Sequence, residues 1–293
     1  MYPATIAGFA LLWYDSFTRF TSPPERPYRY WDGIKKEIPN ENNREKQHYD
    51  TSIDLTYMKS YPPSAPRSQL DQLFITPQFK DGLWKSARLE GKEAHGCADG
   101  KALILQAELQ VGTASSDKQA GVWPAFWALG ESLHKQGSEF KQWPLCGEWD
   151  IFETSDGHDW NLASVHYASP SAPDSGKNFP EGIDDRTIEQ HWHHYNHTEF
   201  HTWAIQVDRR PSKWEDETIQ FKMDGNVYLE FKGSDIKIEE EWAILAHQAY
   251  FPVLNVAIGS NFPRSAGTPG TTNPTTGLDI GMTVNYVAFY EST

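Results

Sequence analysis

The chain has 293 residues, 38% hydrophobic and 23% charged, so it is long enough for a large core and too apolar for bulk disorder. Its formal net charge of −14 repels phosphate backbones, which excludes nucleic acid as a partner and favours an uncharged one. It has no run of 18 apolar residues, so we expect no membrane span and no membrane partner.

Aromatic residues are frequent, at 14% with twelve Trp. Many Trp residues indicate a surface that stacks on flat, neutral rings such as sugars, although a large β core also uses them, and we assign about half to the core. The two cysteines, Cys97 and Cys146, are too few for a disulfide scaffold, and they could either pair or remain free thiols.

The first predicted elements are a strand and a long loop. The stretch MYPATIAGFALLWYDSF (1–17) lacks a basic n-region, so its apolar run is interpreted as a first strand and not as a signal peptide. Region 34–71 carries many charges and is predicted to be a surface loop, as is region 168–198, which has a His-rich end.

Short segments of β-branched and aromatic residues, bounded by Gly, Pro, Asn or Asp, make up most of the remaining chain. Asp224-Gly225 accommodates the positive φ of a hairpin turn between two of them. The pattern predicts an all-β chain, organised as one domain over residues 1–293 and built as a sandwich of two large sheets. The clearest predicted strands are 102–111, 202–208, 218–225 and 284–291.

The run GEWDIFETSDG (147–157) places three carboxylates in a strand-like segment. In a regular strand Glu148 and Asp150 share one face, and Glu153 falls on the other, where burial of its charge is costly. A one-residue β-bulge just before Glu153 would return it to the face of the other two, while Trp149 and one apolar neighbour enter the core. The alternative is an exposed acidic strand whose charges discourage edge pairing.

Carboxyl groups that share one face are suited to glycoside hydrolysis, which needs one carboxylate and one carboxylic acid on either side of the scissile bond. A middle carboxylate raises the pKa of its neighbours by like-charge repulsion. A raised pKa is what a general acid requires near neutral pH, so this spacing favours a glycosidase.

The segment GEWDIFE resembles the E-x-D-x-x-E signature of glycoside hydrolase family 16, in its laminarinase-type (endo-β-1,3-glucanase) branch. Other segments resemble the family in order along nearly the whole chain, except for the loops at 50–80 and 170–198. They are NREKQHY (43–49), SARL (86–89), GVWPAFWALG (121–130), WPLCGEWDIFE (143–153), SVHY (164–167), FHTWAIQVD (200–208), FKMDGNVY (221–228), PVLNVAIGSNFP (252–263) and VNYVAFYE (284–291).

The resemblance implies a β-jelly roll of two curved antiparallel sheets with a concave substrate cleft, and a retaining mechanism that requires no cofactor. It implies that Glu148 is the nucleophile, Glu153 the general acid/base, and Asp150 the acid that holds and tunes Glu148. Matching positions imply that substrate is bound by Trp123, Trp127, His166, Arg88, Asn43, Glu45 and Asn261.

Two of these assignments have alternatives. Trp123 and Trp127 lie four residues apart and therefore on one face of a strand, which suits a sugar platform, but Pro124 between them leaves core packing open for one. A single histidine such as His166 can equally be a buried residue with satisfied hydrogen bonds.

Three positions depart from the family pattern. Trp149 stands where Ile or Leu is usual, and Phe262 stands where a Trp is usual. Asn285 replaces an Asp that helps to bind a structural calcium ion in many members. A neutral amide is a weaker calcium ligand, so such an ion is possible but not favoured, and we expect no metal at the catalytic site.

Two clusters stand apart from the acids. HWHHYNHTEFH (191–201) has five His residues, which could be a metal site, but the irregular spacing favours an exposed loop. The run Glu239-Glu240-Glu241 is interpreted as a solvated acidic edge.

We expect an endo-acting retaining glycoside hydrolase that cleaves β-1,3-glucan or mixed-linkage β-1,3/1,4-glucan by double displacement. The alternatives are a β-1,3-galactanase or a transglycosylase of the same family, and a non-catalytic β-glucan-binding protein. We expect a secreted monomer whose signal peptide is absent from this sequence, and the sequon at Asn196 permits secretion.

Overall fold

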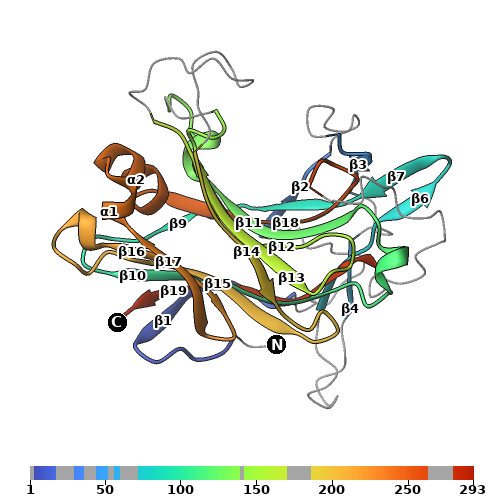
Figure 1. Ribbon diagram of the computed structural model, residues 1–293, viewed down its shortest axis with the longest axis horizontal. Helices are drawn as coiled ribbons and strands as arrows, with labels where there is room; N and C mark the ends of the chain where they lie inside the picture. Colours follow the sequence, from blue (N-terminus) through green and yellow to red (C-terminus); the bar gives the residue numbers. More distant parts are fainter. Residues whose placement is uncertain are drawn as a thin grey trace.

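Two large antiparallel sheets pack face to face (Figure 1). The computed structural model describes residues 3–17, 30–35, 44–51, 56–59, 72–138, 142–169, 186–262 and 280–293, without the side chains of 56–59 and 186–192. The core lies between the sheets, because apolar residues alternate with polar ones along their strands.

Eight strands form the outer sheet: β1 (Phe9–Asp15), β4 (Thr56–Lys59), β5 (Gln72–Ile75), β10 (Ala102–Val111), β15 (His201–Asp208), β16 (Thr218–Met223), β17 (Asn226–Lys232) and β19 (Met282–Ser292). Their order is β17-β16-β15-β10-β19-β5-β4, and β1 also pairs with β19. On β10 the alternating residues Leu103, Leu105 and Ala107 face the core. All four of the clearest predicted strands belong to this sheet.

Eight strands form the inner sheet: β2 (Trp31–Gly33), β8 (Arg88–Gly91), β9 (His95–Gly96), β11 (Val122–Gly130), β12 (Glu148–Glu153), β13 (Trp160–Tyr167), β14 (Arg186–His194) and β18 (Ala249–Ile258). Their order is β14-β13-β12-β11-β18-β8-β2, and β9 also pairs with β18. The acidic strand β12 therefore lies between β11 and β13, inside the sheet.

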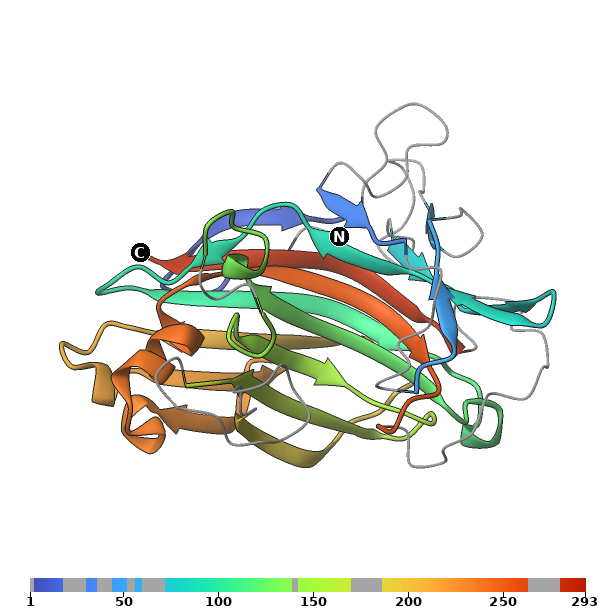
Figure 2. The same ribbon diagram turned by 90° about the horizontal axis from the view of Figure 1, so that it is seen from above.

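Smaller elements lie at the ends of the sandwich. A three-stranded sheet contains β3 (Gln47–Tyr49), β6 (Gln78–Lys80) and β7 (Leu83–Ser86). The described residues form the helices η3 (Ser116–Lys118), η4 (Glu131–Leu133), η5 (Trp214–Asp216), α1 (Gly233–Ile236) and α2 (Glu239–Ala246). Figure 2 shows α1 and α2 at the end opposite to the β6–β7 hairpin. Within the described ranges, the helices are too short or too polar to cross a membrane.

The prediction of an all-β sandwich of two large antiparallel sheets is confirmed. The expectation that about half of the Trp residues are buried is also confirmed where it can be judged, because six of the eleven whose side chains are described are buried. These six are Trp31, Trp84, Trp149, Trp160, Trp203 and Trp242.

Two regions that were predicted to be loops contain strands. β14 lies within 168–198, and β3 and β4 lie within 34–71. β14 has a polar sequence because it is the edge strand of the inner sheet and has only one neighbouring strand. The acidic run Glu239-Glu240-Glu241 is also not an edge: it forms the first turn of α2, where negative side chains stabilise a helix, and Glu241 is buried.

Candidate active site

Strand β12 contains the β-bulge that the sequence predicts. Trp127 of β11 pairs with Asp150, and the residue before Trp127 pairs with Phe152, which leaves Ile151 as one extra residue on β12. The pairing with β13 shifts over the same residues. The bulge places three carboxyl groups on the face of the inner sheet that points away from the outer sheet. This face, called the acid face, carries Glu148, Asp150 and Glu153.

The opposite face of β12 lies in the core. Trp149 is 1% exposed, its ring stacks on Tyr250 at a centroid distance of 3.6 Å, and its indole donates a hydrogen bond to the carbonyl of Leu245. Ile151 and Phe152 are both fully buried in the same core. The prediction that only one apolar neighbour of Trp149 enters the core was therefore wrong, because the bulge turns two consecutive side chains inward.

Asp150 and Glu148 are held by groups from β13 and from the segment before β12. Ser164 Oγ donates a 2.6 Å hydrogen bond to Asp150 Oδ2, and His166 Nε2 lies 3.3 Å from the same oxygen. The indole of Trp143 hydrogen-bonds Glu148. The ring of Trp143 also lies 5.6 Å from that of His166. The structure thus brings His166 to the acids, as predicted.

Both glutamates on the acid face have raised pKa values. Burial raises the pKa of Glu148 to about 8, and repulsion by Asp150 adds to this, while His166 and Arg88 oppose it. Burial also raises the pKa of Glu153 well above its usual range, and both other acids add to the shift. The acid face therefore retains a proton at neutral pH, as general acid catalysis requires.

Glu153 is 7% exposed and is held at two points. Trp123 Nε1 donates a 2.9 Å hydrogen bond to Glu153 Oε1, and the Glu153 amide donates a 2.8 Å hydrogen bond to Asn161 Oδ1. The half-buried ring of Trp123 stacks on Phe262, with the ring centroids 4.8 Å apart. Phe262 thus supplies an aromatic ring at the position where the family pattern has a Trp.

Trp127 is also half-buried, and it packs against a small buried cluster that includes Leu129 and Val253, so neither predicted platform residue is fully buried. Its Nε1 donates a 2.6 Å hydrogen bond to Asn255 Oδ1. The guanidinium carbon of Arg88 lies 4.6 Å from the centre of its ring, a cation–π contact. Two nitrogens of Arg88 also donate to Glu90 Oε1, at 2.9 and 2.6 Å, which fixes the guanidinium beside the ring.

Two of the remaining predicted contacts lie in the described part of the chain. Glu45 forms an isolated β-bridge with Gly259 and accepts a 2.5 Å hydrogen bond from Gln47. Asn261 is exposed in the bend after β18. Asn43 lies outside the described residues.

The sequence analysis missed several polar residues that contact the predicted ones. Asn255 lies on the same face of β18 as Val253 and Ala257. The alternation of side chains along that strand could therefore have identified Asn255 as a polar residue of this face. The others depend on register between strands or on irregular segments. They are Tyr49, which accepts a hydrogen bond from Asn255, and Ser164, Trp143 and Asn161.

One group of potential metal ligands occurs in the described part of the chain, and it consists of Glu148, Asp150 and His166, with ligand atoms within 4.8 Å of one another. The polar groups of the family's calcium position are used within the protein. Asn285 accepts a hydrogen bond from Gln72 and donates one to Glu108.

The His-rich segment is divided between β14, a turn and β15. Its described side chains bind neighbours in the protein: His197 pairs with Asp159, and His201 Nδ1 lies 2.7 Å from Asp224 Oδ2. His194 Nδ1 lies 3.1 Å from the backbone carbonyl of Asp159, and the ring of His193 stacks on Tyr228, so the described histidines of this segment form no shared ligand set.

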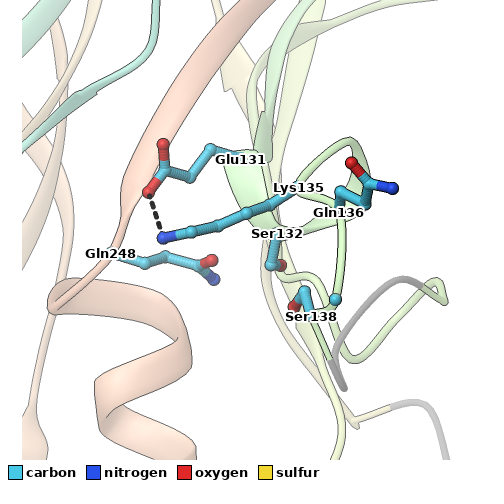
Figure 3. A pocket seen from close by; sticks show the side chains of 7 residues that line it. Glu131, Ser132, Lys135, Gln136, Ser138 and Gln248 are labelled. Atoms are coloured by element: carbon cyan, nitrogen blue, oxygen red, sulfur yellow. Dashed lines mark ion pairs between the residues drawn. The ribbon is translucent and has the colours of Figure 1, made fainter.

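A pocket of about 500 Å³ is lined by none of the three acids (Figure 3). It is lined by residues of η4 and the following segment, together with Gln248, and Lys135 Nζ is 3.8 Å from Glu131. Cys97 belongs to the main core, and Cys146 lies two residues before Glu148, whose charge adds to the raised pKa of the Cys146 thiol. Cys97 and Cys146 are both free and buried, and burial raises the pKa of each thiol to about 12.

The raised pKa of Glu148 predicts a pH-dependent cost to stability. Between its ordinary value of 4.5 and its folded value of about 8, the unfolded chain releases a proton that the folded protein retains, so the folded state loses stability as pH rises. Because Glu148 is only half-buried, we expect wild type to lose about 1–3 kcal/mol more than Glu148→Gln between pH 5 and 8.5.

Urea unfolding at both pH values measures this difference, with Glu230→Gln, an exposed carboxylate of the outer sheet, as the control. The control should follow wild type. An equal loss in wild type and Glu148→Gln would show that burial of Glu148 has no such cost.

Solved structures similar to nearly the whole chain include the following three. An endo-1,3-β-glucanase from Streptomyces sioyaensis is 24% identical, with a TM-score of 0.76 and 100% of both chains covered. An endo-β-1,3-glucanase from Pyrococcus furiosus is 23% identical, with a TM-score of 0.63 over 97% of this chain and 95% of that one. A family 16 protein of the mixed-linkage glucan locus of Bacteroides ovatus is 20% identical, with a TM-score of 0.62 over 94% and 99%.

No protein-family model and no curated protein matches the chain. These structural similarities extend over nearly the full length of both chains, so they concern the whole two-sheet sandwich. The chain therefore has the β-jelly-roll fold of the family 16 endo-glucanases.

Proposed function

We propose that this protein is an endo-acting, retaining glycoside hydrolase that cleaves β-1,3-glucan or mixed-linkage β-1,3/1,4-glucan. The observation that carries the proposal is the bulge at Ile151, which places Glu148, Asp150 and Glu153 on one face, where the pKa of the acid/base Glu153 is raised well above its usual range. The fold supports it, because similar structures include endo-1,3-β-glucanases and a Bacteroides ovatus protein in complex with a G4G4G3G product.

In the first step, Glu148 as a carboxylate attacks the anomeric carbon of the bound sugar and forms a glycosyl-enzyme ester. The bond from that carbon to the bridging oxygen breaks, and Glu153 gives its proton to the leaving oxygen. The raised pKa of Glu153 keeps that proton available. Asp150, held by Ser164, orients Glu148.

In the second step, a water molecule attacks the same carbon and the ester bond to Glu148 breaks. Glu153, now ionised, accepts the proton of that water and returns to its starting state. Two inversions give net retention of the anomeric configuration. The steps need carboxyl groups and water only, so we propose that no cofactor is required.

The substrate contacts follow from the same face. Trp123 and Trp127 present half-buried rings on either side of Ala125, the residue of β11 that pairs with Glu153, and sugar rings stack on such surfaces. A neutral polymer also suits the net charge of −14. We propose secretion as a monomer, since a polymeric glucan is reached outside the cell, and the sequon residue Asn196 is exposed.

The test is release of reducing ends from laminarin, barley β-glucan and β-1,3-galactan by the wild-type protein. We expect cleavage of the first two into oligosaccharides of mixed length, and the first-formed products should have the β configuration by proton NMR. Cleavage of the galactan alone would make the protein a galactanase, and longer products from oligosaccharides would make it a transglycosylase. Binding of glucan without any cleavage would make it a binding protein and overturn the proposal.

A further inference from the structure

Two side chains hold the bulge of β12 from the face opposite to the acids. Asn161 of β13 is fully buried, and its Oδ1 accepts the 2.8 Å hydrogen bond from the Glu153 amide. Its Nδ2 donates a 2.9 Å hydrogen bond to Tyr228 Oη. Tyr228 belongs to β17 of the outer sheet, and its hydroxyl donates to the carbonyl of Ile151 at 3.4 Å. A continuous set of bonds therefore connects the outer sheet to the extra residue and to the acid.

These two side chains supply the hydrogen-bond partners that backbone groups in a bulge lack. A bulge disrupts the ladder locally, so backbone groups beside the extra residue need other partners, and buried ones must find them within the protein. An asparagine amide can accept from a backbone N–H and donate to a hydroxyl at the same time. Burial raises the pKa of Tyr228, so its hydroxyl keeps the proton that it donates to Ile151.

Glu153 is consequently fixed at both ends. Trp123 binds its carboxylate at 2.9 Å on the acid face, and Asn161 binds its backbone at 2.8 Å on the core face. Without Asn161, the amide of Glu153 would lose its partner, and the backbone that directs the side chain would be free to shift. A displacement of about 1 Å in a reacting group can reduce a rate by about 100-fold.

We propose that Asn161 and Tyr228 are positioning residues that fix the bulge and thereby aim Glu153 at the leaving oxygen. This inference rests on the proposed glycosidase function. It adds two residues that contact no substrate and that connect the outer sheet to proton transfer.

A comparison of two leaving groups tests the inference. The sugar leaving group of laminarin needs a proton from Glu153, whereas 2,4-dinitrophenolate leaves without one. We expect Asn161→Leu to lower kcat/KM on laminarin by about 100-fold, and kcat/KM on a dinitrophenyl β-laminaribioside by about 3-fold or less. Tyr228→Phe, which removes one oxygen atom, should show the same pattern with a loss of about 5-fold on laminarin.

Matched controls come from the outer sheet. Asn285→Leu removes a buried asparagine that also makes two side-chain hydrogen bonds, and Tyr290→Phe removes a hydroxyl that donates to the carbonyl of Ala4. Both controls should lower the rates on the two substrates equally, in proportion to any loss of folded protein. Glu153→Ala should show the full difference between the two substrates.

Equal losses on laminarin and on the dinitrophenyl substrate for Asn161→Leu would overturn the inference and leave Asn161 with a structural role only. If Asn161→Leu does not fold, Tyr228→Phe decides by the same criterion. A wild-type protein that cuts neither substrate would instead refute the proposed function. This result is distinct from any result with the two variants, because it concerns the unmodified protein.

Discussion

Replacement of Glu148 by glutamine is expected to lower kcat on β-1,3-glucan by about 10⁴-fold or more. Glutamine preserves the size of the side chain and an oxygen that can accept the hydrogen bond from Trp143, but it has no charge with which to attack the anomeric carbon. Release of reducing ends measures the loss, and circular dichroism confirms that the variant is folded. A variant with more than about 1% of wild-type turnover would show that Glu148 is not the nucleophile.

Azide distinguishes the roles of the two glutamates. With a dinitrophenyl glycoside as substrate, Glu148→Ala leaves space for azide on the face of the sugar where the carboxylate was, so the product should be the α-glycosyl azide. Glu153→Ala still forms the glycosyl-enzyme, which azide attacks from the opposite face, so the product should be the β-glycosyl azide. The reverse pair of products would mean that the two assignments must be exchanged.

Replacement of Trp149 by alanine is expected to lower the free energy of unfolding by about 3–5 kcal/mol. The substitution leaves a cavity in the core, removes the stacking on Tyr250 and leaves the carbonyl of Leu245 without its donor. Urea unfolding with an unchanged slope would report this loss as a shift of the midpoint.

Trp149→Phe serves as the matched control for that variant, because it retains a ring against Tyr250 and removes the indole N–H. Its loss should be smaller, about 1–2 kcal/mol. If Trp149→Ala lost less than about 1 kcal/mol, the residue that departs from the family pattern would not be part of the packed core that the structure describes.

The sequence was sufficient to predict the acid face because two local rules conflict there. Strict alternation would have buried the charge of Glu153, and the cost of that burial made a bulge the economical solution. The shared face of Trp123 and Trp127 followed from the same alternation, because the two residues are four positions apart on one strand. Such predictions need only the two-residue period of a strand and the free-energy cost of burying a charged side chain. Both apply to a few consecutive residues of the sequence.

Contacts between distant segments could not be predicted in the same way. Asn161 lies in a segment that looks like an ordinary buried strand, and its function depends on Tyr228, 67 positions later in the chain. The contact of Arg88 with Trp127 depends on how β8, β18 and β11 are aligned. The polar edge strand β14 was missed because an edge strand lacks the apolar pattern that marks a central one.

The extra residue at Ile151 makes distance along the chain differ from distance in space. Glu148 and Glu153 are five residues apart in β12, but their partners Leu129 and Ala125 are only four apart in β11. Any graft of this catalytic strand into another sandwich must therefore carry Ile151 with it. Deletion of Ile151 would shorten β12 by one residue and restore the regular alternation of its side chains. Glu153 would then still pair with β11, but without the β-bulge that now directs its side chain.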